Sequence, residues 1–231
     1  MSKLNISIVQ FPGSNCDHDI EHLYGKVLGA NVNTIWHKDT DLRNPDIVIL
    51  PGGFSFGDYL RTGALARVSP VMEEVRRFSN KGGKVLGICN GFQILCECGL
   101  LPGVLLRNIK TKFLSRYVHI KVERVDTAFS DRFKKDSIIT CPVAHGEGNY
   151  FADSETIKEL EGEGLIVFRY CGLNGEVSHQ DSSINPNGSI NSIAGISNKK
   201  GNIVGLMPHP ERAAEDIVGN VGKHSGMAVF G

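Results

Sequence analysis

Cysteine, histidine and glutamate occur in this chain at positions where they could form a nucleophile and its base. Cys89 lies between two glycines in the segment GICNGFQIL, residues 87–95, directly after the apolar run Val85–Ile88. A strand that turns sharply into a helix holds one side chain above the sheet, in a strained backbone that flanking glycines permit. The helix N-terminus then directs N–H groups at whatever the side chain attacks and stabilises a thiolate, the reactive form of cysteine. The pattern is therefore compatible with Cys89 as a nucleophile.

A structural role is the alternative for Cys89. A cysteine at the end of a buried strand is usually a small core residue, and the chain has six cysteines. The local pattern by itself favours neither interpretation, so the decision depends on a base elsewhere in the chain.

The candidate base is His209, in the segment MPHPER at residues 207–212. In a two-residue extended step, His209 and Glu211 point the same way, so the carboxylate can orient the imidazole while the imidazole faces the thiol. Taken alone, this segment also fits a surface turn made by two prolines. Together with Cys89 it predicts a triad in which His209 is the base and Glu211 the orienting group.

A thiol that attacks an amide or ester needs N–H donors for the oxyanion that forms. One predicted donor is the backbone N–H of Asn90, the residue after the nucleophile. The other should come from a glycine loop at a neighbouring strand end. The segment Pro51-Gly52-Gly53 fits this description, and we expect Gly53 to supply the donor.

The elements that must position these residues alternate between strand and helix in the first half of the chain. The pattern predicts strands at Ile6–Gln10, Val32–Trp36, Asp46–Leu50 and Val85–Ile88, and helices at 17–28 (capped by Asp17), Val68–Phe78 and Gly91–Cys98. Such alternation is typical of a parallel sheet with helices on both faces.

The second half is richer in strand patterns. Strands are predicted at Tyr117–Val125, Ile138–Val143, Leu165–Tyr170, Ser192–Ile196 and Ile203–Met207, with a polar loop at Asn174–Asn191. No linker is visible, so we expect a single α/β domain over 1–231 with an open, mixed but mostly parallel sheet. Ligands bind such sheets beyond the carboxyl ends of the strands, which places the site at loops 11–16, 51–58, 89–91 and the segment after Met207.

Composition excludes several classes of protein. Lys plus Arg equals Asp plus Glu at 25 each, so no net field attracts nucleic acid or an anionic membrane. No apolar run is long enough to span a membrane, and the N-terminus does not have the pattern of a signal peptide. The cysteine spacings do not suggest a disulfide framework or, at Cys96 and Cys98, a metal site, so we expect a reducing cytoplasm and no metal.

Two features are left without an assigned role. Cys16 lies in a strand-end loop on the proposed site edge and is therefore a rival thiol, but it lacks the glycine-and-helix context of Cys89. We interpret it as structural or as lining the site. The glycine-rich tail 219–231 has no indicated function.

The segments that carry this chemistry resemble the class I, or triad, glutamine amidotransferases, whose fold is flavodoxin-like. The matching segments are QFPGSNCD at 10–17, PGGFSFGDYLRTGA at 51–64, GICNGFQIL at 87–95, AHGEGNY at 144–150 and MPHPER at 207–212. Two of them, GICNGFQ and MPHPER, are typical of the whole family. The other three are similar to the glutaminase subunits of phosphoribosylformylglycinamidine synthase, an enzyme of purine biosynthesis.

The resemblance implies hydrolysis of glutamine at Cys89 through a γ-glutamyl thioester, with release of ammonia. It implies glutamine contacts from Gly52, Gln93, His145, Gly146 and Glu147. No cofactor is expected on this chain. A separate large synthetase subunit would use ATP and magnesium to convert formylglycinamide ribonucleotide into its amidine, and a small third subunit would bridge the two.

Other interpretations stay open. The chain could be the glutaminase of another amidotransferase, or a silent scaffold, although a scaffold would be expected to lose Cys, His or Glu. Cysteine peptidases and chaperone-like proteins with a similar elbow usually carry His directly after the cysteine, where this chain has Asn90. If the partner exists, we expect it to dock around 54–64 and 144–150, and the isolated subunit to be nearly idle.

Overall fold

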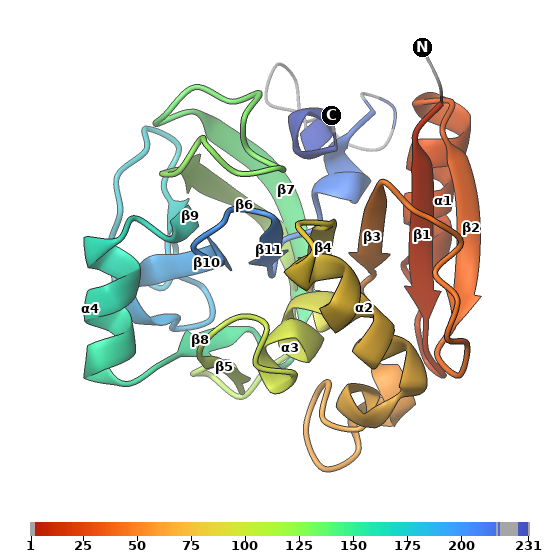
Figure 1. Ribbon diagram of the computed structural model, residues 1–231. Coiled ribbons are helices and arrows are strands. Elements are labelled where there is room, and N and C mark those ends of the chain that lie inside the picture. The colour runs from red at the N-terminus through yellow and green to blue at the C-terminus, as the bar shows by residue number, and fades with distance from the viewer. Residues whose placement is uncertain (1–2, 216, 218–225, 231) are drawn as a thin grey trace.

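The first half of the chain forms the parallel part of the sheet, as its alternating pattern predicts. The computed structural model describes residues 3–215, 217 and 226–230. In spatial order, the parallel strands are β2 (Asn31–Trp36), β1 (Asn5–Gln10), β3 (Ile47–Leu50), β4 (Lys84–Ile88) and β11 (Ile203–Leu206) (Figure 1). Every residue of β3 is buried, as is typical of a parallel strand covered on both faces.

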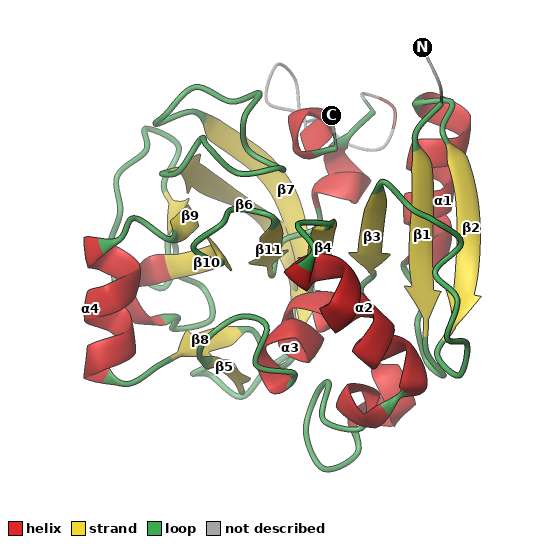
Figure 2. Ribbon diagram, viewed as in Figure 1, coloured by secondary structure: helices red, strands yellow, loops and turns green. Residues whose placement is uncertain are grey.

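Antiparallel strands from the second half extend this sheet beyond β11. They are β10 (Ile193–Ser197), β9 (Ile166–Cys171), β6 (Leu114–Val122) and β7 (Ile138–His145) (Figure 2). A separate antiparallel pair joins β5 (Val104–Leu106) to β8 (Asn149–Phe151). The expectation of a mixed, mostly parallel sheet is confirmed.

Helices lie on both faces of the parallel part. Helix α1 (Asp17–Glu21), which continues as a π-helical turn at His22–Val27, lies behind β1 and β2 in Figure 1. In front of β4 lie α2 (Pro70–Asn80) and α3 (Asn90–Glu97). Because β1-to-β2 and β3-to-β4 move in opposite directions across the sheet, right-handed crossovers place their helices on opposite faces.

Two local expectations need correction. Cys16, not Asp17, occupies the N-cap position of α1, and the Asp17 carboxylate accepts a hydrogen bond from Gln10 Nε2 at 2.6 Å instead. Strand β6 begins three residues earlier than predicted, because its pairing with β7 from Leu114 to Lys121 extends into a stretch without polar–apolar alternation.

Helix α4 (Ser154–Gly162) was not predicted at all. A signal was present, since the Asp153 carboxylate caps the helix by accepting from the Thr156 N–H at 2.8 Å. Only Leu160 of this helix is buried, so the sequence lacks the apolar periodicity from which a helix is predicted. The tail 219–231, for which the sequence indicated no role, lies mostly outside the described residues.

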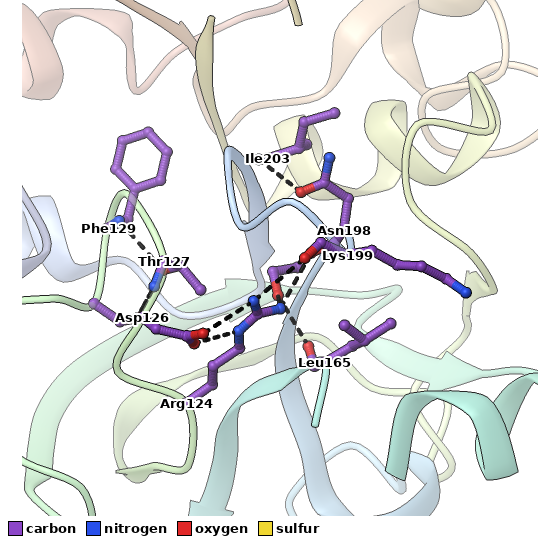
Figure 3. A network of polar contacts seen from close by, with 10 residues as sticks. Arg124, Asp126, Thr127, Phe129, Leu165, Asn198, Lys199 and Ile203 are labelled. Carbon is purple, nitrogen blue, oxygen red and sulfur yellow. Dashed lines mark hydrogen bonds and ion pairs between the residues drawn. The ribbon is translucent and has the colours of Figure 1, made fainter. Parts of the chain in front are cut away.

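A polar network around Arg124 links the segment after β6 to the end of β10 and the turn before β11, the strand that His209 follows. The Arg124 guanidinium donates to Ser197 Oγ at 2.9 Å, to the Asn198 carbonyl at 3.2 Å and to Asp126 Oδ1 at 2.6 Å (Figure 3). The Ser197 hydroxyl in turn donates to the Leu165 carbonyl. Through these bonds the segment after β6 fixes the turn between β10 and β11.

The carboxyl ends of β1, β3, β4 and β11 meet at one edge of the sheet, because these strands are parallel neighbours. The loops that follow them therefore converge, as the sequence predicts. No helix within the described ranges is both long enough and apolar enough to cross a membrane.

Candidate active site

Cys89 occupies a strained turn between β4 and α3. Its backbone angles are φ 52° and ψ −105°, a region that residues other than glycine rarely adopt. The Cys89 N–H donates to the Leu206 carbonyl at 2.8 Å, while its own carbonyl accepts from the N–H groups of Phe92 and Gln93. The neighbouring strand and the helix thus hold the strain in place. The predicted elbow is confirmed.

The glycines on either side of Cys89 are needed for close packing. A Cβ atom added to Gly91 would lie 1.9 Å from the Leu50 carbonyl oxygen, and one added to Gly87 would lie 2.5 Å from Leu95 Cδ1. Larger residues at either position would push α3 away from the sheet. The turn that presents the thiol therefore depends on both glycines.

His209 and Glu211 form a buried pair beside this thiol. His209 Nδ1 lies 2.6 Å from Glu211 Oε1, and the two side chains are 1% and 0% exposed. The His209 N–H donates to the Pro142 carbonyl at 2.8 Å, which anchors the segment to β7. Their expected contact is present, but the expected extended step is not, because Pro210–Ala213 forms a 3₁₀ turn that swings Glu211 back toward the ring.

The Glu211 contact leaves His209 Nε2 available to the thiols. Among the described residues, neither Nε2 nor Glu211 Oε2 has a hydrogen-bond partner that meets ordinary geometry. Burial by itself lowers the pKa of His209, but the Glu211 carboxylate, the Cys89 thiol and the Cys16 thiol outweigh it and raise the pKa well above its ordinary value. The ring therefore retains a proton that it could donate to a leaving group.

One predicted oxyanion donor, Gly53, lines the same cavity as Cys89, and the other, Asn90, follows Cys89 directly in the chain. Asn90 is the first residue of α3, so its N–H has no partner within the helix. Gly53 and Ser14 form a short antiparallel bridge, but its hydrogen bonds come from the N–H groups of Phe54 and Asn15. The Gly53 N–H takes no part in that bridge, and Gly53 lines the cavity beside the thiol.

A cavity of about 320 Å³ opens in front of Cys89. This volume suits a small amino acid. Polar and charged side chains form much of its wall, and the lining residues are Gly53, Phe54, Asp58, Thr62, Cys89, Gln93, Arg107, Thr111, Phe113, Ala144, His145, Gly146 and Glu147.

Four of the five residues predicted to contact a substrate line this cavity: Gln93, His145, Gly146 and Glu147. The Gln93 amide is already engaged, since Nε2 donates to the Glu147 carbonyl at 2.6 Å and Oε1 accepts from Asn90 Nδ2 at 2.9 Å. Gln93 therefore shapes the cavity by holding the 145–148 loop against α3.

Gly52, the fifth residue, lies elsewhere. A Cβ atom at Gly52 would approach His209 Cε1 to 2.7 Å, Cys16 Sγ to 3.0 Å and Cys89 Cβ to 3.4 Å. The missing side chain leaves room for the histidine ring and the two thiols. Gly52 is thus placed to shape the nucleophile's surroundings, and it is absent from the residues that line the cavity.

His145 has the environment of a neutral side chain. Burial, reinforced by the charge of His209, lowers the pKa of His145 to about 3. Its Nδ1 lies 3.0 Å from Asn108 Oδ1, an acceptor, so Nδ1 carries the proton. This ring is fixed in place and is poorly suited to act as a second base.

Sequence reasoning missed Asn108 and two residues of the cavity wall. Asn108 Oδ1 accepts from the Gly148 N–H at 3.0 Å, and Asn108 Nδ2 donates to the His145 carbonyl at 2.8 Å, so one side chain organises the loop. Thr62 Oγ1 donates to Glu147 Oε2 at 2.9 Å. Burial, together with the charge of Glu147, raises the pKa of Asp58 to about 6. Thr62 and Asp58 fall within the segment 51–64 that carried the family resemblance, whereas no pattern marked Asn108.

Cys16, the rival thiol, belongs to the same site. Its sulfur accepts a hydrogen bond from Arg212 Nη2 at 2.9 Å, and it lines a second cavity of about 170 Å³ together with Cys89 and His209. Burial raises the pKa of Cys16, although His209 and Arg212 act in the opposite direction. Cys16 precedes a helix but lacks the strained turn of Cys89, which favours Cys89 as the nucleophile.

Comparison with known proteins gives one consistent relationship. A family model described as the CobB/CobQ-like glutamine amidotransferase domain matches residues 3–228. The chain is 54% identical over 220 residues to "Phosphoribosylformylglycinamidine synthase subunit PurQ" of Chlorobaculum tepidum, which covers 95% of this chain and 93% of the relative. It is 53% identical over 214 residues to the protein of the same name from Thermus thermophilus, with 93% and 92% covered.

Solved structures agree with these relatives. A chain of the "Structure of PurLQS from Thermotoga maritima" superposes with a TM-score of 0.83 and 39% identity, over 99% of this chain and 96% of that one. A glutamine amidotransferase from Thermotoga maritima superposes with a TM-score of 0.57 at 15% identity, over 93% of this chain and 79% of that one. The second similarity is one of fold.

Proposed function

The chain belongs to the family of CobB/CobQ-like glutamine amidotransferase domains, and from this premise we propose that it is the glutaminase subunit of phosphoribosylformylglycinamidine synthase. It hydrolyses glutamine and supplies ammonia for the synthesis of formylglycinamidine ribonucleotide, a step of purine biosynthesis. The observation that carries the proposal is the Cys89 elbow, which lines a cavity of about 320 Å³ on one side and on the other shares a smaller cavity with His209, the partner of Glu211 in a buried pair. A relative that is 54% identical in sequence over 95% of this chain bears that enzyme's name.

The first half of the reaction transfers the γ-glutamyl group to the protein. The Cys89 thiolate attacks the γ-amide carbon of glutamine, and the oxyanion that forms accepts hydrogen bonds from the N–H groups of Asn90 and Gly53. His209 then donates its proton to the amide nitrogen. The carbon–nitrogen bond breaks, ammonia leaves, and a γ-glutamyl thioester remains on Cys89.

The second half regenerates the thiol. The now neutral His209 removes a proton from water, and the resulting hydroxide attacks the thioester carbon. The carbon–sulfur bond breaks, glutamate leaves, and Cys89 returns as the thiolate beside a protonated His209. Glu211 keeps the ring in one orientation throughout and stabilises its positive charge, since its Oε1 stays 2.6 Å from Nδ1 in the resting site.

Charged side chains of the cavity wall fit the two ends of an amino acid. Glu147 and Asp58 place two carboxylates at one part of the wall, where they suit the α-ammonium group of glutamine. Arg107, whose Nε lies 3.6 Å from Glu147 Oε1, supplies a cation for the α-carboxylate. Together these contacts would orient the γ-amide toward Cys89.

Ammonia passes to a separate large synthetase subunit, and a small subunit bridges the two. The ATP and magnesium of the reaction bind to the synthetase, and this chain needs no cofactor for its own half of the chemistry. We place the complex in the cytoplasm, which agrees with the cysteines: all six lie in the described part of the chain and none is in a disulfide.

Exposed apolar side chains around the cavity support docking at this face. Leu60 is 87% and Tyr59 75% exposed, both beside the cavity residue Asp58, and Phe113 at the cavity wall is 55% exposed. Exposed apolar groups gathered at one place are typical of an interaction surface. They agree with the docking region 54–64 expected from the sequence.

The proposal is tested by glutamate release from glutamine, with and without the synthetase, the bridging subunit, ATP and formylglycinamide ribonucleotide. Wild type should hydrolyse glutamine rapidly only in the full assembly. Cys89→Ala should abolish glutamine-dependent synthesis and leave ammonia-dependent synthesis intact, while Cys171→Ser, a matched removal of a distant buried thiol, should change neither. Glutamine use by Cys89→Ala would exclude Cys89 as the nucleophile.

A second experiment addresses the docking surface. Leu60→Asp should weaken assembly with the synthetase about tenfold or more, because it places a charge in an apolar contact. Leu173→Asp, an equally exposed apolar position (74%) outside this surface, is the control. Unchanged assembly of the Leu60 variant would place the interface elsewhere.

A further inference from the structure

Two cavities meet at Cys89, and of these two it is the smaller one that His209 lines. The cavities of about 320 Å³ and about 170 Å³ share the wall residues Gly53, Phe54, Cys89, Phe113 and Ala144. The rest of the smaller cavity is lined by Asn15, Cys16, His209 and Arg212. The thiol therefore lies between a space that suits an amino acid and a space that contains the base.

The order of the reaction assigns different contents to the two cavities, on the premise of the proposed function. After ammonia has left, the γ-glutamyl group stays attached to Cys89 and still occupies the larger cavity. The molecule that then attacks the thioester has to give a proton to His209, so it approaches from the side of the histidine. The smaller cavity is several times larger than the roughly 30 Å³ that one water molecule takes up in the liquid, and it can therefore hold that molecule.

The His209 ring has a nitrogen for this molecule. His209 is 1% exposed, and its Nδ1 lies 2.6 Å from Glu211 Oε1. Its Nε2 has no hydrogen-bond partner of ordinary geometry within the described residues. Because an unpaired buried polar atom is unfavourable, a small molecule that donates a hydrogen bond to Nε2 is stabilised there and is at the same time placed to lose a proton.

Cys16 limits the space beside the base. Its sulfur lies within 4.8 Å of a ring nitrogen of His209, so a molecule bound at the ring also meets the sulfur. The thiol is held from two sides, since Sγ accepts from Arg212 Nη2 at 2.9 Å and donates to Asn15 Oδ1 at 3.1 Å. Burial raises the pKa of Cys16, which keeps the thiol protonated and unable to compete with Cys89 for the acyl group. Cys16 thus acts as a wall residue.

Arg212 makes the smaller cavity unfavourable for cations. Its guanidinium is held at the wall by the bond to Cys16 and by a second bond, from Nε to Asp19 Oδ2 at 3.0 Å. A positive charge at the wall repels a positively charged molecule. The cavity therefore favours neutral nucleophiles over ammonium or protonated alkylamines.

We propose that the cavity of about 170 Å³ is the acceptor pocket of the γ-glutamyl thioester, a site for small neutral nucleophiles, and that Cys16 determines which of them fit beside His209. Water is the acceptor when glutamate forms. A neutral hydroxylamine takes the same place: its nitrogen bonds to the thioester carbon, the carbon–sulfur bond breaks, and one amine proton passes to His209. Cys89 returns as the thiolate and γ-glutamyl hydroxamate leaves, so the chain also transfers the γ-glutamyl group to small amines.

The test compares hydroxylamine with methoxyamine, which carries one more methyl group and is likewise neutral near pH 7.5. The assembled enzyme receives glutamine and each amine, and the γ-glutamyl products are measured beside glutamate. In Cys16→Ala, the use of methoxyamine relative to hydroxylamine should rise about tenfold over wild type, because one methyl-sized group in a pocket changes discrimination about 10-fold or more. Cys171→Ala, which removes a buried thiol elsewhere, should keep the wild-type ratio. An unchanged ratio in Cys16→Ala overturns the proposal.

Two further variants test the pocket from other sides. Thr111 lines the larger cavity and not the smaller one, so Thr111→Ala should leave the ratio of the two amines as in wild type. A shift with Thr111→Ala as large as that with Cys16→Ala would overturn the assignment to the smaller cavity. Cys16→Val, which narrows the pocket, should slow glutamate release about tenfold, and radioactive γ-glutamyl thioester should then accumulate on the chain after acid quenching. Normal glutamate release by this variant contradicts the proposal.

Labelling also separates this inference from the proposed function on which it rests. Thioester formation by wild type and by both Cys16 variants shows that the first half of the reaction is intact, so that only the choice of acceptor is compared. If wild type forms neither labelled thioester nor glutamate in the full assembly, the proposed function fails and the acceptor pocket with it. If both form and the Cys16 variants behave as wild type, the acceptor pocket alone is refuted.

Discussion

Replacing Asp58 with asparagine measures what a charge at the cavity wall costs the folded protein. Asp58 Oδ1 is buried and has no hydrogen-bond partner among the described residues. Burial, with the repulsion of Glu147, raises the pKa of Asp58 from its ordinary 3.8 to about 6. At about 1.4 kcal/mol per pKa unit, the ionised carboxylate destabilises the fold by about 3 kcal/mol. Because the side chain is only half-buried, solvent screening reduces this to about 1–2 kcal/mol.

The sign of the effect depends on pH. A folded-state pKa above the unfolded value means that the folded protein binds this proton more tightly, so stability falls as pH rises from about 4 to about 6 and then stays level. Asp58→Asn should therefore be about 1–2 kcal/mol more stable than wild type near pH 7.5 and equal to it near pH 4, by urea unfolding. Asp58 has φ 56°, which asparagine tolerates. The exposed Asp131→Asn is the control.

The same variant tests how glutamine is held. If Asp58 contacts the α-ammonium group, its neutralisation should raise KM for glutamine about tenfold, since a charged hydrogen bond contributes about 1.5 kcal/mol. The fall of kcat/KM below about pH 6 should disappear with it. Absence of any stabilisation near pH 7.5 would refute the electrostatic reasoning. Stabilisation with an unchanged KM would support the electrostatics and refute the contact with substrate.

Three further changes test the triad, the elbow and the loop. Glu211→Gln should lower the pKa of His209 and reduce kcat for glutamine by up to about 10⁴-fold, as neutralising a triad carboxylate does. Cys89→Ala, by comparison, should leave no glutamine use. A normal kcat of the Glu211→Gln variant would show that another group orients the His209 ring. Gly91→Ala should destabilise the fold by about 1–3 kcal/mol in thermal unfolding, because its Cβ would lie 1.9 Å from the Leu50 carbonyl oxygen, whereas Gly162→Ala, with nothing within 4 Å, should be harmless. Equal melting temperatures of the two alanine variants would contradict the packing account. Asn108→Ala leaves the Gly148 N–H and His145 Nδ1 unpaired, so it should lower the free energy of unfolding by about 1–3 kcal/mol and raise KM for glutamine. An unchanged KM would mean that the 145–148 loop does not bind substrate.

The sequence by itself determined the parts of the protein that depend on local chain geometry. A short apolar run that ends in Gly-x-Cys-x-Gly is compatible with a tight turn out of the sheet, and the structure has that turn at Cys89 with φ 52°. Strand–helix alternation predicted the parallel order of the first half, and parallel strands bring their carboxyl ends to one edge. His209 and Glu211 could be predicted as a pair because they follow a strand end two residues apart, although a 3₁₀ turn and not the expected extended step brings them together.

Only the tertiary structure decided which side chains meet across that edge. Cys16 approaches His209 because loop 11–16 packs on Gly52, as the hydrogen bond from Cys16 N–H to the Gly52 carbonyl records. Asn108 reaches the 145–148 loop from a segment without any pattern. The start of β6 likewise depended on its pairing with β7, a partner further along the chain. Helix α4 has only one buried residue, so its apolar pattern was too weak to predict. The π-helical and 3₁₀ turns also had no pattern in the sequence that predicted them. Local sequence specifies backbone conformation over a few residues, whereas contacts between loops depend on the packing of the whole sheet.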